Sequence, residues 1–196
     1  MKKIKTLSLL FAACFFALVS CNTKNNQDDS KEIAEEQNED KFDDTDLEDD
    51  TEFAVTAADG GMLEVQLAQL ALTKASSPKV KEFAQTMVDD HSKANEELKK
   101  LAQTKNITLP TTLSEENQKD YDDIAKKSGT EFDEAYCEFM VKDHKDDLDK
   151  FKKAADKAED ADLKSWAAGK VPVLEHHLSM AEEMENTVKS TSDARN

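Results

Sequence analysis

Three histidines lie on or beside the apolar stripe of a helical pattern, and each has a methionine within about one helical turn. Imidazole nitrogen binds zinc, iron and copper, and thioether sulfur is a soft ligand that suits Cu(I). The pattern therefore indicates a transition metal as the one cofactor that these residues could hold. The histidines are His91, His144 and His177, and the methionines are Met87, Met140 and Met180.

Glu64 is the carboxylate that could complete this donor set. It follows Gly60 and Gly61 and precedes Ala68 and Ala71 on a face of small residues. A buried carboxylate without a partner is costly, so Glu64 on such a face requires one. Three imidazoles and one carboxylate are together suited to zinc, iron or copper.

The same residues also fit a purely structural role. Buried histidines can fix the register of packed helices through hydrogen bonds. The aspartates that precede two of them, Asp90 and Asp143, can hold an adjoining backbone or side chain in the same way. Methionines at helical spacing commonly fill a core. The sequence leaves the structural and the metal-binding interpretations open.

The sequence contains no recognisable catalytic signature. It has no glycine-rich phosphate loop, no Gly-x-Ser-x-Gly elbow, no Cys-x-x-Cys pair and no His-Glu-x-x-His motif. We therefore predict no catalytic residues and a non-enzymatic protein.

The residues that would position the site belong to an all-helical chain. From residue 53 onward, glycine and proline are scarce and the alternation typical of strands is missing. Pro172 is expected to bend the last helix, which contains it. The expected helices are 53–75, 78–105, 114–128, 130–157 and 160–189.

An internal repeat groups these helices into pairs. The segment 87–91 (MVDDH) recurs 53 residues later as 140–144 (MVKDH). Two long helices that carry the same pattern, each paired with another long helix, favour a four-helix bundle of two hairpins joined by a short crossover helix. In such a bundle Glu64, His91, His144 and His177 come one from each long helix.

Five segments and one residue pair form recognisable motifs: 53–67 (FAVTAADGGMLEVQL), 80–84 (VKEFA), 87–95 (MVDDHSKAN), 128–133 (SGTEFD) and 172–178 (PVLEHHL), with the pair Asp143 and His144. They resemble a bacterial family, the domain-of-unknown-function family numbered 4142. The resemblance implies a ferritin-like bundle in exported or outer-membrane proteins, and no established reaction. Ferritin-like di-iron proteins carry Glu three residues before each ligand histidine, whereas this sequence has Val88, Val141 and Leu174 there.

The amino-terminal residues 1–20 have the charged-then-apolar order of a secretory signal. The apolar run 7–19 is shorter than the ~20 residues that span a bilayer, so the signal is expected to be removed. Residues 18–21 (LVSC) match the cleavage site of bacterial lipoproteins, which predicts a fatty acid such as palmitate on Cys21. Only Cys137 then remains in the folded part, and no intramolecular disulfide is expected.

The segment 21–52 is strongly acidic, with fourteen Asp or Glu against three Lys in 22–52. So few of its residues are large and apolar that we predict a disordered linker between the lipid and the domain. The bundle is predicted to cover 53–190, and 191–196 form a tail.

The charge and the signal set the expected location and partners. A net charge of −17 argues against nucleic acid as a partner. The lipid predicts membrane attachment in the cell envelope, on the outer membrane. We therefore expect an anchored helical module that binds an envelope protein or supports the envelope under stress, with metal binding or redox chemistry as the alternative.

Overall fold

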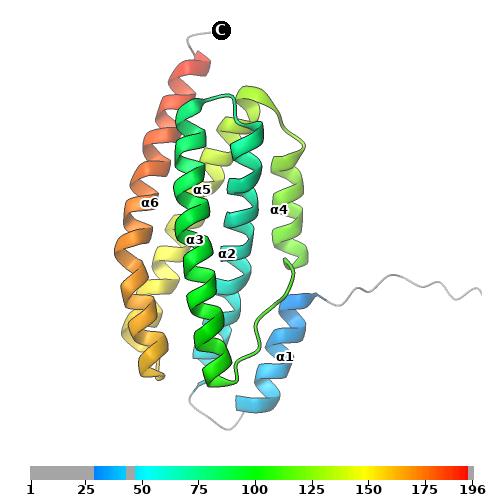
Figure 1. The fold of residues 1–196 in the computed structure, drawn as a ribbon, viewed down its shortest axis with the longest axis vertical. Helices are drawn as coiled ribbons and strands as arrows, with labels where there is room; N and C mark the ends of the chain where they lie inside the picture. The colour runs from blue at the N-terminus through cyan, green and yellow to red at the C-terminus, as the bar shows by residue number, and fades with distance from the viewer. Residues whose placement is uncertain (1–28, 43–46, 194–196) are drawn as a thin grey trace, which may run out of the picture.

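A computed structural model describes residues 29–42 and 47–193, which form six helices and no β-strand (Figure 1). The all-α fold expected from the sequence is confirmed. The helices are α1 (Ser30–Phe42), α2 (Glu48–Lys74), α3 (Pro78–Lys105), α4 (Glu115–Ala125), α5 (Gly129–Lys157) and α6 (Ala161–Asp193).

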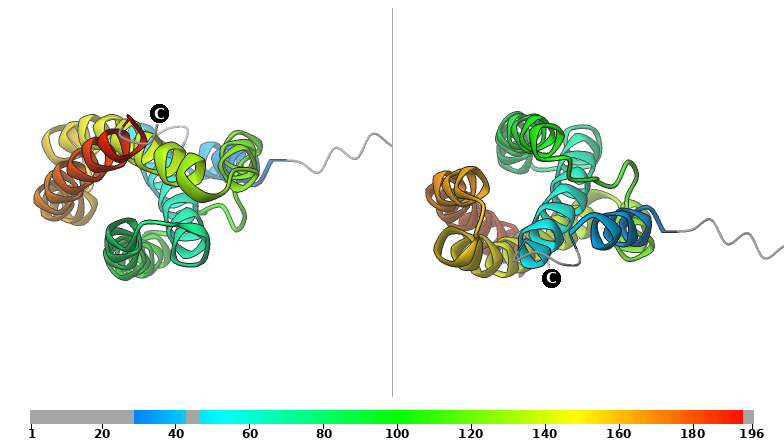
Figure 2. Two further views of the ribbon diagram at one scale, coloured as in Figure 1. Left: turned by 90° about the horizontal axis from the view of Figure 1, so that it is seen from above. Right: turned by 90° about the horizontal axis from the view of Figure 1, so that it is seen from below.

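The four long helices form a bundle of two hairpins, α2 with α3 and α5 with α6. The short helix α4 lies in the connection between the hairpins. Helices α1 and α4 follow one another along the outer side of α2, as the end-on views show (Figure 2). The arrangement leaves the space between the four long helices for the core.

Local sequence signals explain where the helices begin and end. Pro78 occupies the first turn of α3, where its missing N–H costs nothing. Asn106 ends α3 in the left-handed conformation, with φ 58°. Ser114 caps α4, and its side chain accepts a hydrogen bond from the Asn117 N–H at 3.2 Å. Pro172 lies inside α6 without ending it.

Each hairpin stabilises the turn of the other hairpin through one buried aspartate. Asp133, in the first turns of α5, accepts hydrogen bonds from the backbone N–H groups of Ser76 and Ser77 in the α2–α3 turn, both at 2.9 Å. Asp50, in the first turn of α2, accepts from the N–H groups of Glu159 and Asp160 in the α5–α6 turn, at 3.2 and 2.7 Å. The two hairpins are therefore joined at both ends of the bundle.

The apolar core has two parts with a polar layer between them. On α5, for example, His144 lies between Met140, which belongs to the first part, and Leu148, which belongs to the second. The second part consists of two clusters that share Phe53 and Trp166. The first part includes Leu63, Leu67, Phe83, Met87, Tyr136 and Met140, and the second includes Ala54, Leu98, Leu148, Phe151, Leu163 and Leu174.

The prediction of a disordered linker over 21–52 is wrong for the part of it that the structure describes. Residues Ser30–Phe42 form α1, and α2 begins at Glu48 rather than at residue 53. Polar contacts hold α1 in place. The Asn38 amide donates to the carbonyl of Thr108 at 2.9 Å and accepts from its N–H at 2.7 Å. A count of apolar residues cannot detect such docking.

The predicted signal 1–20 and Cys21 lie outside the described residues, as do 194–196 of the expected tail. Across 29–42 and 47–193, every helix is too short or too polar to cross a membrane.

Candidate functional site

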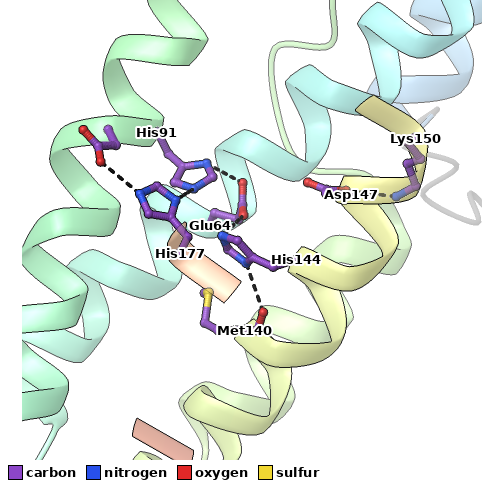
Figure 3. A network of polar contacts seen from close by, with 8 residues as sticks. Glu64, His91, Met140, His144, Asp147, Lys150 and His177 are labelled. Carbon is purple, nitrogen blue, oxygen red and sulfur yellow. Dashed lines mark hydrogen bonds and ion pairs between the residues drawn. The ribbon is translucent and has the colours of Figure 1, made fainter. Parts of the chain in front are cut away.

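The polar layer contains Glu64, His91, His144 and His177, which α2, α3, α5 and α6 contribute in turn (Figure 3). One ring nitrogen of each histidine lies within 4.8 Å of a ring nitrogen of each of the other two. All four side chains are buried, with exposed fractions of 1%, 7%, 0% and 1% in that order. The structure thus brings together the four residues that the sequence singled out.

A chain of hydrogen bonds runs from the surface into this cluster. Oδ2 of Asp90, a half-exposed side chain, lies 2.9 Å from Nε2 of His177. Nδ1 of His177 lies 3.2 Å from Nε2 of His91, and Nδ1 of His91 lies 2.6 Å from Oε2 of Glu64. Asp90 therefore holds a side chain of another helix, as one interpretation of the sequence expected.

These contacts fix where the ring protons lie. A carboxylate accepts, so Nε2 of His177 donates to Asp90 and Nδ1 of His177 is left with a lone pair. Nε2 of His91 donates to that lone pair. The remaining short contact, between Nδ1 of His91 and Oε2 of Glu64, must contain a proton, because two bare acceptors would repel one another.

His144 has an equally defined orientation. Its Nδ1 lies 3.0 Å from the carbonyl oxygen of Met140, which can only accept, so Nδ1 carries the proton. Its Nε2 is buried and has no hydrogen-bond partner among the described residues. The nearest polar atom of Glu64, Oε1, lies 3.5 Å away. His144 therefore directs an unused lone pair into the cluster.

Asp143 adds a second carboxyl group to the site. Ligand atoms of Glu64, Asp143 and His144 lie within 4.8 Å of one another. Oε1 of Glu64 and Oδ2 of Asp143 are buried, and no N–H or hydroxyl group of the described residues donates to either, so these two carboxyl groups can hydrogen-bond to one another only by sharing a proton. Buried polar atoms are nearly always satisfied, so this group of acceptors requires protons or a cation.

Burial dominates the electrostatics of the site. It lowers the pKa of His91 to about 4 and that of His144 to about 3, and it also lowers the pKa of His177. All three rings are therefore neutral near pH 7 and can act as ligands. Burial raises the pKa of both Glu64 and Asp143 well above the usual range, so these carboxyl groups retain protons that a bound cation would displace.

Small residues on α2 allow the neighbouring helices to approach Glu64. A Cβ on Gly61 would overlap the side-chain amide of Asn95 on α3. On the other side, a Cβ on Gly60 would lie 4.0 Å from Oδ2 of Asp147 on α5. The small-residue face noted in the sequence thus brings α3 close to Glu64 at Gly61.

The three methionines considered as ligands in the sequence analysis pack against the apolar core. Met87 and Met140 are fully buried in the first part of the apolar core, and Met180 packs against it. Met140 also supplies the carbonyl group that orients His144. All three therefore pack in the core, as the structural interpretation expected of methionines, although each lies within a helical turn of a site histidine.

Asp143 and Asp147 were not identified as site residues from the sequence. A second repeat places Asp143: residues 51–53 (TEF) recur as 130–132, and the same spacing of 79 residues separates Glu64 from Asp143. The two carboxyl groups thus hold equivalent positions in α2 and α5. Asp147 is buried beside them and pairs with Lys150 at 3.1 Å.

The donor set fits a transition-metal ion. His144 has a ring nitrogen with a free lone pair. If His91 moved its proton to Nδ1, beside Glu64, both Nε2 of His91 and Nδ1 of His177 would become available as well. An imidazole whose other nitrogen donates to a carboxylate is the usual arrangement of a metal-bound histidine.

Two solved structures share this fold, and the family of the chain follows from its sequence. They are of CopM in the Cu(I)-bound form (TM-score 0.61, 17% identity) and in the Cu(II)-bound form (TM-score 0.60, 15% identity). Each alignment covers 70% of this chain and 96% of the other. The curated protein sequences contain no match. The family model described as "Domain of unknown function (DUF4142)" matches residues 32–184, so the chain belongs to that family.

Proposed function

We propose that this protein binds a transition-metal ion, copper first among them, at His91, His144 and His177, and that a lipid on Cys21 anchors it in the cell envelope. The observation that carries the proposal is the buried Nε2 of His144, which has no partner in the described residues and faces two further imidazoles. A structural histidine would have both ring nitrogens satisfied.

The roles of the residues follow from the hydrogen bonds. Nε2 of His144, Nδ1 of His177 and Nε2 of His91 are the ligand atoms, because the opposite nitrogen of each ring is held by Met140, Asp90 or Glu64. Glu64 would accept the Nδ1–H of His91 and balance the charge of the ion. A bound copper ion would supply one-electron redox chemistry or transport in this position.

Two arguments favour copper over zinc. Among divalent first-row ions, nitrogen donors bind Cu²⁺ most tightly. The shared fold of CopM, whose structures hold Cu(I) and Cu(II), makes copper the first ion to test. The absence of a catalytic motif in the sequence is compatible with carriage or storage of the ion.

The test is an equilibrium titration of metal-free protein with Cu²⁺, Cu(I) and Zn²⁺ in competition with chelators of known affinity, together with elemental analysis of natively purified protein. We expect one ion per chain in the wild type and at least a ~100-fold loss of affinity in His144→Ala, which exceeds the usual cost of losing a residue that only hydrogen-bonds to a metal ligand. His176→Ala is the matched control, because His176 is exposed and next to His177. Equal binding by both variants would disprove the proposal.

A further inference from the structure

An acidic cavity of about 160 Å³ lies between α2, α4 and α5. Its lining contains Asp143, whose carboxyl group keeps its proton, and five further acidic side chains against three lysines. The five are Asp59, Glu116, Asp120, Asp146 and Asp147. Such an excess of negative charge in a hollow concentrates cations and speeds their arrival.

Asp143 connects this cavity to the histidine cluster. The residue lines the cavity, yet its Oδ2 is buried and receives no N–H or hydroxyl donor from the described residues, and its carboxyl group faces that of Glu64. Ligand atoms of Glu64 and His144 lie within 4.8 Å of it. Both of these side chains are almost fully buried, and each has an unpartnered atom, Oε1 of Glu64 and Nε2 of His144. Two oxygens and one nitrogen therefore face one another at the inner end of the cavity.

The opposite side of the cluster is less suited to a cation. There a cavity of about 90 Å³ is lined by His91 and His177, with Asp90 and Asp147 against two lysines, besides the protonated Glu64. The balance of charge is closer to neutral, so the field of the protein draws cations toward the Asp143 side.

We propose that Glu64, Asp143 and His144 form an oxygen-rich position for a hydrated divalent cation, through which the ion passes from the acidic cavity to the three-histidine site. His144 is common to both positions, so Nε2 would keep hold of the ion while carboxylate oxygens are exchanged for the imidazoles of His91 and His177. The two positions then serve one ion at a time. This inference rests on the proposed function.

The rate of Cu²⁺ uptake by the full chain tests the route. Trp166 is the single tryptophan, and it lines the histidine-side cavity, so stopped-flow quenching of its fluorescence reports arrival at that site. We expect Asp143→Asn to slow association by about tenfold, because an amide cannot become the carboxylate ligand that Asp143 becomes when the ion displaces its proton. Dissociation should slow by a similar factor, because a residue on the path lowers the barrier for both entry and exit of the ion. The Kd should therefore change by less than about threefold.

Two further variants make the test specific. Asp149→Asn makes the same carboxyl-to-amide change on the exposed surface of α5, and Asp149 lines neither cavity, so the association rate of this variant should stay within about twofold of the wild type. Asp146→Asn, at the exposed wall of the acidic cavity, should slow association by an intermediate factor and weaken its dependence on salt. Helical circular dichroism of each variant confirms folding.

An Asp143→Asn rate equal to that of Asp149→Asn would overturn the route. So would a loss of affinity that comes from faster dissociation alone, because it would make Asp143 a ligand of the final site. Failure of the proposed function is a different result: the wild type would then bind no ion in the equilibrium titration.

Discussion

Oε2 of Glu64 lies 2.6 Å from Nδ1 of His91, and both side chains are buried. The contact contains a proton, and Nε2 of His91 carries a second one that it donates to His177. Metal binding at Nε2 must expel one of these two protons, while the other stays between His91 and Glu64. We expect about one proton released per ion, measured by calorimetry in buffers of different ionisation enthalpy. Binding without proton release would contradict this assignment.

The same proton sets the pH dependence of metal affinity. The pKa of His91 is lowered to about 4 and that of His144 to about 3, so protons do not compete for these rings above about pH 5. The raised pKa of Glu64 means that its proton is the competitor, and rising pH removes it. Affinity should therefore rise about tenfold per pH unit below the raised pKa of Glu64 and level off above it. Three ordinary histidines would give a steeper dependence below pH 6.5.

Glu64→Gln should weaken metal binding by about 10- to 100-fold. The amide can still accept from His91, but it brings no negative charge to the ion. The metal-free protein should keep its thermal stability, because burial already holds Glu64 protonated and an amide of the same shape replaces it. Competition with a chelator and a thermal melt measure the two effects. A large loss of stability with no change in affinity would favour a structural role for Glu64.

Asp133→Ala should lower the free energy of unfolding by about 2–4 kcal/mol, because the backbone N–H groups of Ser76 and Ser77 both lose their acceptor. Urea denaturation followed by circular dichroism gives the value. Glu138→Ala, an exposed carboxylate on the same helix, is the control and should change stability by less than about 0.5 kcal/mol. An equal effect of both substitutions would contradict the conclusion that Asp133 stabilises the α2–α3 turn.

Cys137 should be inert in the folded protein. Burial raises the pKa of its thiol to about 12, so the reactive thiolate is scarce at pH 8. Alkylation by iodoacetamide should be at least about a thousandfold slower than for an exposed cysteine, and should become fast in urea. Mass spectrometry of the labelled peptides follows Cys137 separately from Cys14 and Cys21. Rapid labelling in native buffer would show that this part of the core opens.

Cys21→Ser should abolish lipid attachment, because the acyl group is carried by the thiol sulfur. The helical domain should still fold, since the contacts described for it involve residues from Asp29 onward. Metabolic labelling with a fatty-acid analogue and membrane fractionation compare the variant with the wild type. Equal labelling of the two proteins would place the cleavage site elsewhere.

The sequence predicted the bundle, and the meeting of four polar side chains at its centre, for physical reasons. Helix periodicity and a proline in the first turn, Pro78, are local signals, and the bounds of α3 agree with the prediction. Glu64 and the three histidines were polar residues on apolar faces, where a buried partner was required. Convergence of the four side chains followed once each was assigned to a different helix.

Other features depend on contacts between distant segments. Helix α1 is held by the amide of Asn38 against the backbone of Thr108, a partner 70 residues away. Asp143 was noted only as the residue before His144, because its position opposite Glu64 follows from how the hairpins pack. Neither the docking of α1 nor the second carboxyl group could be inferred from periodicity.

Each hairpin has a turn that is hydrogen-bonded by an aspartate of the other hairpin, and this affects how the bundle folds. The turn of α2–α3 is completed by Asp133 of the other hairpin, and the turn of α5–α6 is completed by Asp50. Neither half of the chain can satisfy its own turn, so a hairpin made in isolation would lack its stabilising carboxylate. The bundle should therefore behave as one cooperative unit, with amide hydrogen exchange in both turns governed by the same global opening.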